Sequence, residues 1–374
     1  MNKKPGDAVL GYESLRKKKP SRALHHRRNK RMRSVRYFIW LTLALCLNTC
    51  KDTGNPVNGK PPCPPIRIGA PSPYSEPVWH PSGQFIGFNY LPLVRITYPY
   101  GEHCQGQYEW NLDSSGYWLV NPDGTSLRRI LPYFLEMVSW SPDGESIVFG
   151  AGAQIFKMRF TGTTFDTTTV TQLTFEGRNF FPAWSPDGEW IAYDSNSESP
   201  NGMNFIWLMR RDGSEKRRIT YEPSQGEIRM PHWSANGNKI THIRYLVGAF
   251  SSEIFSMDSN GTNPKRLTLN NSTDYYPRYS PDPAIGGAGG TKIAFWSKLG
   301  DGLGNIWVMN ADGSNPQQLT TEGTTDWLSW SPVGRRIVYV NHSWTDWTYA
   351  NGTIWVVNVE TGEKQQLTFN HPKK

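Results

Sequence analysis

Aromatic side chains gather in two long, otherwise polar segments of the sequence. These segments contain Tyr98, Tyr100, His103 and Trp110 within residues 90–115, and Trp344, Trp347 and Tyr349 within residues 341–352. Aromatic residues are enriched at binding hot spots, and their rings also stack on sugars. The pattern predicts an exposed face that binds a protein or a glycan. The alternative is that these side chains pack against their own loops.

Four charged residues recur a few positions before apolar runs: Arg178, Arg229, Asp274 and Asp326. We expect them either to face a shared central channel or to cap loop backbones. Carboxylate and carbonyl oxygens also suit Ca²⁺, but the sequence has no EF-hand spacing. We therefore expect no cofactor, with Ca²⁺ as the alternative.

Catalytic motifs are missing from the chain. It has neither a G-x-S-x-G nucleophile elbow nor an H-E-x-x-H zinc motif. The sequence therefore favours a protein that is not an enzyme. Paired carboxylates for glycoside chemistry can be recognised only from coordinates, so a carbohydrate hydrolase or lyase stays open as an alternative.

The elements that would position these residues form an internal repeat. A phrase of the type "PAWSPDGEWIAY" occurs six times, and its aromatic anchors are Trp79, Trp140, Trp184, Trp233, Tyr279 and Trp330. The anchors are 61, 44, 49, 46 and 51 residues apart. A second phrase follows each copy, as in "NIWVMNADGSNPQQLT", and usually ends in Leu-Thr.

Each repeat unit predicts four short strands. Pro, Asp and Gly suit a tight turn, and the apolar runs on either side alternate with period two. Four strands in about 45 residues are typical of a propeller blade. We therefore predict an all-β fold, a six-bladed β-propeller of four-stranded antiparallel blades over residues 74–374. The anchors should pack between neighbouring blades.

Charge divides the chain into two parts. Residues 1–50 hold 13 of the 40 Lys and Arg and 2 of the 32 Asp and Glu. The remainder, with 27 basic and 30 acidic residues, carries a net charge of −3. A nearly neutral propeller lacks the basic surface that nucleic acid requires, so we expect no nucleic-acid partner.

Residues 1–50 read as a basic leader followed by a lipoprotein-like signal peptide. The apolar run from Tyr37 to Leu47 is too short to span a bilayer comfortably, and translation could start at Met32. The run ends at Cys50, the predicted lipidation site, and residues 51–73 form a flexible tether. Ordinary signal cleavage is the alternative to lipidation.

Export has two further consequences. It would permit a disulfide between Cys63 and Cys104, and two free thiols are the alternative. It would also place the chain at a membrane as a lipoprotein that faces the periplasm or the cell surface.

The SPDG and Leu-Thr repeats resemble those of the TolB-type six-bladed propellers, which carry WD-repeat-like Pro-Asp repeats. The resemblance covers nearly all of the chain after the leader. TolB itself has an α/β domain before its propeller, whereas a short tether stands here, so the chain looks TolB-like without being TolB.

The missing catalytic motifs, the leader and this fold together favour a non-enzymatic binding module at the bacterial cell envelope, monomeric, with an envelope protein or glycan as partner. Besides the carbohydrate-active enzyme, a propeller partner of a separately encoded peptidase is an alternative.

Overall fold

The computed structural model describes residues 72–97, 107–221, 226–246, 248, 251–270, 272–281, 290–300, 304–323, 325–342 and 352–369. All of them belong to one compact unit, Asp52–Lys374. The described elements are strands, and none of the described segments is a helix long and apolar enough to cross a membrane.

The first three blades take their strands from the first half of the described chain. Blade 1 consists of β1 (Tyr74–Trp79), β2 (Ile86–Tyr90), β5 (Gly116–Val120) and β6 (Arg128–Leu131). Blade 2 consists of β7 (Glu136–Trp140), β8 (Ser146–Ala151), β9 (Gln154–Phe160) and β10 (Phe165–Gln172). Blade 3 consists of β11 (Asn179–Trp184), β12 (Trp190–Ser195), β13 (Phe205–Arg210) and β14 (Arg217–Arg218).

The other three blades follow the same order. Blade 4 consists of β15 (Ile228–Trp233), β16 (Lys239–Tyr245), β17 (Ser252–Asp258) and β18 (Lys265–Arg266). Blade 5 consists of β19 (Asp274–Tyr279), β20 (Lys292–Ser297), β21 (Asn305–Asn310) and β22 (Gln317–Gln318). Blade 6 consists of β23 (Thr325–Trp330), β24 (Arg336–His342), β25 (Gly352–Asn358) and β26 (Lys364–Gln366).

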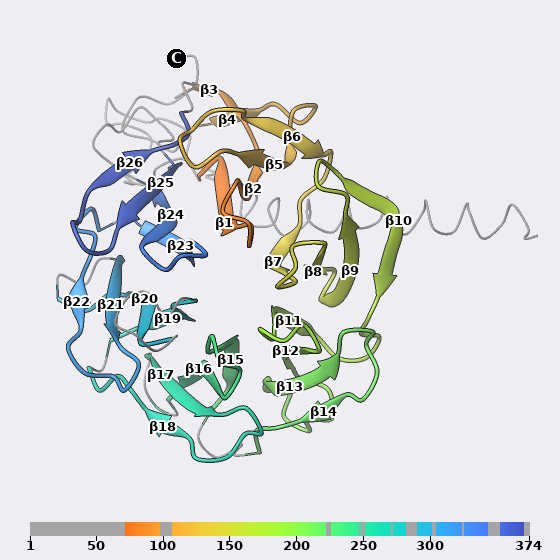
Figure 1. The fold of residues 1–374 in the computed structure, drawn as a ribbon, viewed down its shortest axis with the longest axis vertical. Coiled ribbons are helices and arrows are strands. Elements are labelled where there is room, and N and C mark those ends of the chain that lie inside the picture. The colour runs from red at the N-terminus through yellow and green to blue at the C-terminus, as the bar shows by residue number, and fades with distance from the viewer. Residues whose placement is uncertain are drawn as a thin grey trace, which may run out of the picture. The chain divides into compact units, whose positions relative to one another are not determined.

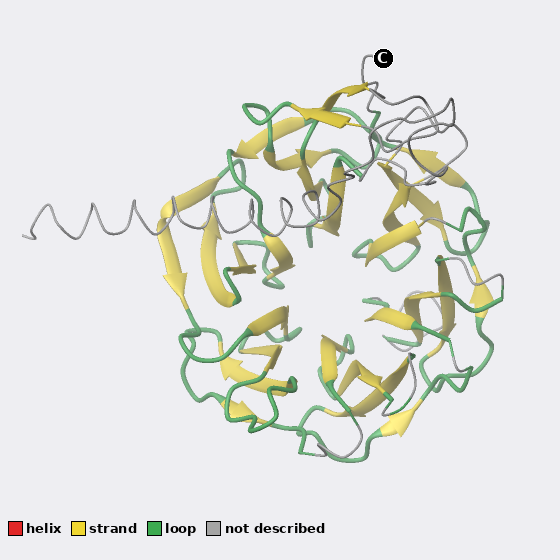
Figure 2. Cartoon of the chain, turned by 180° about the vertical axis from the view of Figure 1, so that it is seen from behind, coloured by secondary structure: helices red, strands yellow, loops and turns green. Residues whose placement is uncertain are grey.

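The six blades stand around a central axis, with β1, β7, β11, β15, β19 and β23 innermost (Figure 1). Strands and loops make up the whole described ring (Figure 2). Every pairing within a blade is antiparallel, as between β12 and β13. The six-bladed all-β fold predicted from the repeat is therefore confirmed. A hairpin of β3 (Leu93–Thr97) and β4 (Gln107–Trp110) is added in the long segment of blade 1.

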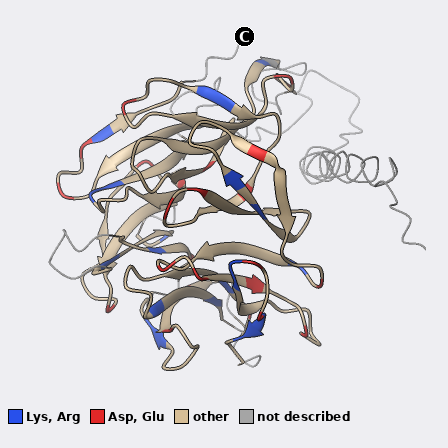
Figure 3. Cartoon of the chain, turned by 45° about the vertical axis from the view of Figure 1, so that its right-hand side comes forward, with Lys and Arg blue, Asp and Glu red and all other residues tan. Residues whose placement is uncertain are grey.

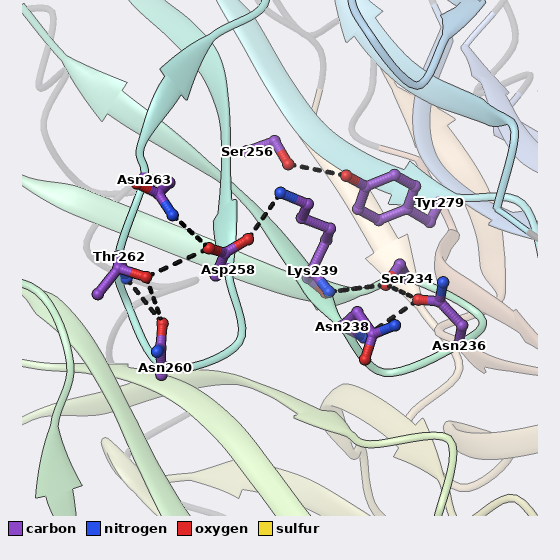
Figure 4. Close-up of polar contacts among 10 residues, drawn as sticks. All are labelled: Ser234, Asn236, Asn238, Lys239, Ser256, Asp258, Asn260, Thr262, Asn263 and Tyr279. Carbon is purple, nitrogen blue, oxygen red and sulfur yellow. Dashed lines mark hydrogen bonds and ion pairs between the residues drawn. The ribbon is translucent and has the colours of Figure 1, made fainter.

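The SPDG turns join the innermost strand of each blade to the second strand. In blade 2 the turn is closed by two backbone bonds, from Gly144 N to Ser141 O (2.8 Å) and from Ser141 N to Ser146 O (2.9 Å). Blade 4 has Ser234 and Asn236 in the equivalent turn, and Lys239 N donates to Ser234 Oγ (2.9 Å; Figure 4). These contacts define one end of the channel, which we call the turn face.

The Leu-Thr pairs lie at the opposite end, which we call the loop face. Their threonine hydroxyls accept the N–H of an isoleucine near the start of the third strand, in the pairs Ile155–Thr174 (2.8 Å), Ile206–Thr220 (2.9 Å), Ile254–Thr268 (2.9 Å), Ile306–Thr320 (2.8 Å) and Ile354–Thr368 (2.9 Å). All five threonines are buried. Each bond satisfies a buried amide that lies beyond the pairing with the outermost strand.

The aromatic anchors pack between neighbouring blades, as the repeat predicts. The Trp233 indole N–H donates to Ala183 O of blade 3 (3.1 Å), and that of Trp330 donates to Arg278 O of blade 5 (2.9 Å). A different bond joins blades 1 and 6: the backbone N–H of Trp79 donates to Ser329 Oγ of blade 6 (3.3 Å), as the backbone N–H of Trp184 donates to Ser139 Oγ of blade 2 (3.0 Å).

Two equivalent turn glycines test how tightly the blades pack at the turn face. Gly144 and Gly188 have φ of 72° and 75°, so alanine strains both backbones by roughly 1 kcal/mol. A Cβ at Gly144 would lie 2.6 Å from the His80 ring of blade 1, whereas one at Gly188 meets nothing closer than 3.7 Å. Gly144→Ala should therefore lower the free energy of unfolding more than Gly188→Ala, as measured by urea denaturation. Equal losses would contradict this packing.

Candidate functional site

Each innermost strand carries a β-bulge three residues before its aromatic anchor. The bulge residues have left-handed backbone angles, with φ of 55° at Glu76, 53° at Met137, 49° at Phe181, 58° at Met230, 53° at Tyr276 and 45° at Trp327. The pairing with the second strand shifts register at the same place in all six blades. A bulge re-aims the side chain that it carries, and strained backbone of this kind is often associated with functional sites.

Four bulge side chains meet at the axis and form what we call the channel plug: Met137, Phe181, Tyr276 and Trp327. The rings of Phe181 and Tyr276, from blades 3 and 5, lie 6.2 Å apart, and those of Tyr276 and Trp327 lie 4.7 Å apart. Phe181 N also donates to Met137 Sδ (3.2 Å). Because the contact between Phe181 and Tyr276 joins blades 3 and 5, which are not adjacent, the plug crosses the axis of the channel at this level.

A pocket of about 310 Å³ lies on the turn-face side of the plug. Its walls run from the plug residues to Pro81, Pro281 and Pro332 in the turns, and they include all six aromatic anchors except Trp233. This volume is at the lower end of the range for small-molecule sites. The pocket therefore suits a small ligand or one short segment of a partner.

The acidic and basic side chains of the pocket are Glu76, His232 and Arg278. Burial lowers the pKa of Arg278 to about 10, and nearby Tyr276 and Glu76 oppose the shift. Burial also lowers the pKa of His232 well below its usual range, and its Nδ1 faces the N–H of Tyr279 (3.3 Å). At neutral pH the arginine is therefore charged and the histidine is neutral.

Glu76 is the acid of the pocket. Burial raises its pKa to about 8, and repulsion from Glu136 and Asp326 adds to the shift, while the bond that its carboxylate accepts from Met137 N opposes it. At neutral pH most of the Glu76 carboxyl is therefore protonated and can donate a hydrogen bond. The pocket presents two donors, this acid and the Arg278 guanidinium, between aromatic walls.

Asp326 and Arg229, both singled out by the sequence, lie near the channel but do not line this pocket. Burial raises the pKa of Asp326 to about 6, and its carboxylate accepts the N–H of Trp327 (2.8 Å). Arg229 lies 3.6 Å from the fully buried carboxylate of Asp194 in blade 3 and over the Phe180 ring (5.3 Å). It therefore joins blades 3 and 4.

The other described candidates are separate from one another. Asp274 is buried and accepts from Ser297 Oγ (2.5 Å). Arg178 is exposed on the loop face, where its backbone N–H bonds Asn196 Oδ1 (2.7 Å). Trp110 pairs with Leu93 in the added hairpin. The remaining predicted residues lie outside the described part of the chain: Cys50, Cys63, Tyr98, Tyr100, His103, Cys104, Trp344, Trp347 and Tyr349.

The sequence reasoning missed Glu76 and Arg278. A signal was present, because Glu76 occupies the repeat position at which the other blades carry Met, Phe, Met, Tyr and Trp. Arg278 likewise directly precedes its anchor, at a position where the other blades have Val, Ser, Ala, His and Ser.

Within the described residues, no group of three His, Cys, Asp or Glu side chains is placed to hold a metal ion.

Comparison with known proteins supports a TolB-like propeller. No family model matches the chain. An uncharacterised protein of Agrobacterium fabrum is 33% identical over 187 residues, which are 45% of this chain and 59% of that protein. A TolB homologue of Chlorobium luteolum is 29% identical over 155 residues, 41% of this chain and 32% of that protein. The chain thus spans about a third to three fifths of the length of these relatives.

Among solved structures, a TolB-like protein of Agrobacterium tumefaciens superposes with a TM-score of 0.54 and 23% identity, over 65% of this chain and 84% of that one. The likeness in fold and the sequence matches agree with the repeat motifs. The chain is a TolB-like six-bladed β-propeller.

The raised pKa of Glu76 predicts a pH-dependent stability. Between its ordinary pKa of 4.5 and about 8, the folded state holds this proton more tightly than the unfolded state, so stability falls as pH rises through this window. Glu76→Gln removes the titration and keeps an acceptor for Met137 N. The free energy of unfolding of the variant should therefore fall less from pH 5 to pH 8, by roughly 3 kcal/mol.

Urea denaturation at the two pH values measures the difference. Glu145→Gln, in an exposed turn, is the matched control and should behave like the wild type. Identical pH dependence in Glu76→Gln and wild type would show that folding does not raise the pKa of Glu76.

Proposed function

We propose that the chain is an exported, lipid-anchored and non-enzymatic binding module of the bacterial cell envelope. Its binding site is the pocket between the channel plug and the turn face, and its partner is an envelope protein or other ligand that inserts an anionic group there. The observation that carries the proposal is Arg278. This guanidinium lines an aromatic-walled pocket and has no carboxylate within ion-pair distance among the described residues.

The chemistry of the pocket favours an anion. A guanidinium binds a carboxylate or phosphate through paired, charge-assisted hydrogen bonds, which are stronger than neutral ones. The protonated Glu76 supplies a second donor on the same side. Walls of Trp and Tyr are typical of the desolvated centre of a protein interface. A segment with an acidic side chain or a terminal carboxylate next to an apolar residue fits both features.

Placement at the envelope rests on the leader. The apolar run that ends at Cys50 and the polar residues after it favour export and lipidation. The name of one relative, the TolB homologue of Chlorobium luteolum, is consistent with a place in the cell envelope.

Enzymatic alternatives are supported by one feature. Glu76, Glu136 and Asp326 are carboxylates with raised pKa values close to one channel, and an acid of raised pKa beside an ionised one is the arrangement of a glycosidase. A hydrolase or lyase would show turnover that is lost in Glu76→Gln or Asp326→Asn, whereas the proposed module binds without turnover.

The second alternative is a propeller that assists a separately encoded peptidase. In that case a hydrolase would co-purify with the chain.

Affinity capture tests the proposal. The full chain, solubilised in detergent, is used to capture its partner from envelope extract, and the partner is identified by mass spectrometry and then titrated. Arg278→Gln should weaken binding by about 10- to 100-fold, because hydrogen bonds to a charged group are worth roughly 1.5–3 kcal/mol.

Arg178→Gln, which changes an exposed arginine on the loop face, is the control and should bind like the wild type. Equal affinities for wild type and Arg278→Gln would exclude the pocket as the binding site.

A further inference from the structure

Large apolar side chains are exposed at one repeated position of the loop face. The residue directly after the capping threonine is Phe175, Tyr221, Leu269 or Phe369 in four blades, with exposed fractions of 70%, 67%, 77% and 60%. The threonine is held by its bond to the third strand, so the following side chain is directed to solvent in each blade. We call these four residues the apolar rim.

The rim is concentrated on one end of the propeller. Of the seven large hydrophobic side chains exposed in the described residues, the rim supplies four, and Leu112, in the connection from β4 to β5, adds a fifth to the loop face. The other two, Leu127 and Val333, lie in turns of the opposite face. The loop face thus carries five of these seven side chains, a bias that an interaction surface on this face would explain.

The chain joins the propeller at this same face. Tyr74, the first residue of β1, donates its hydroxyl to the backbone carbonyl of Phe369 (3.1 Å), so the described chain starts beside a member of the apolar rim. The leader with its apolar run and Cys50 precedes this point by a tether of about twenty residues. A lipid anchor at Cys50 would therefore be connected to the propeller at its loop face.

Charges near the rim are of both signs. Glu176 and Arg178 follow Phe175, the Arg218 guanidinium lies 5.2 Å from the Tyr221 ring, and Glu322 pairs with Lys364 (2.6 Å). Basic and acidic positions are both spread over several blades (Figure 3). Attraction to anionic lipid therefore contributes little, and apolar insertion is the interaction that the surface supports.

We propose that the apolar rim inserts into the interfacial region of a phospholipid bilayer and docks the propeller with its loop face on the membrane. Aromatic and aliphatic side chains at the level of the headgroups stabilise this kind of contact. The turn face then points away from the bilayer. The inference rests on the proposed membrane attachment and is independent of what the pocket binds.

Hydrogen exchange of the full chain, free in detergent and bound to phosphatidylcholine vesicles, tests the docking. Backbone amides around Phe175, Tyr221 and Leu269 should exchange severalfold more slowly on vesicles, and those around Leu127 and Val333 should not change. The protection should persist at high salt. Slower exchange on both faces, or on neither, would overturn the proposal and would favour a protein as the partner of the rim.

Matched variants complete the test. Phe175→Ser with Leu269→Ser should abolish the protection while the chain stays on the vesicles through its anchor, and Leu127→Ser with Val333→Ser should leave it unchanged. Unaltered exchange at the turn face shows that each variant is folded. Partner binding at Arg278 is measured without vesicles, so the two proposals can fail separately.

Discussion

The contact between neighbouring blades is the interaction on which the rest of this structure depends. A four-stranded sheet cannot bury both of its faces alone, and here each face is covered by the next blade. Blades 1 and 6 share one apolar cluster that includes Trp79, Phe88, Val338 and Ile354, so the ring closes by the same packing that joins consecutive blades. Closure leaves no blade with an uncovered face, which explains why the repeats at the two ends look like those in the middle.

Six innermost strands that converge on one axis create a second constraint. Their side chains share the space around the axis, and the bulge in each strand re-aims the side chain that it carries. The left-handed backbone at residues such as Phe181 and Tyr276 is unfavourable for bulky side chains, and it is held in place because their rings pack on one another across the channel. The plug is thus a consequence of the bulges, and the pocket is the space left between the plug and the turns.

The repeat was sufficient to predict the fold, because SPDG turns and Leu-Thr pairs are local signals that report strand ends. The site was harder to predict, since the behaviour of its residues depends on partners far away in the chain. Arg229 is a case: its position suggested the channel, but Asp194, 35 residues earlier, holds it between two blades. The pKa of Glu76 is raised because the folded chain buries its carboxyl group and brings Glu136 of blade 2 and Asp326 of blade 6 near it. No local pattern contains that information.

The two ends of the propeller differ in polarity because different side chains bond the backbone there. At the turn face the aspartates are occupied by their own turns: Asp212 and Asp312 each accept bonds from the serine two residues later, which lowers their pKa values. That end is therefore polar and ionised. At the loop face the hydroxyls of the capping threonines accept the N–H groups at the starts of the third strands. The residue after each threonine is not needed for these bonds and can be apolar. The plug lies between these ends, so a ligand that approaches through water reaches Arg278 from the turn face, while the apolar rim serves a different surface.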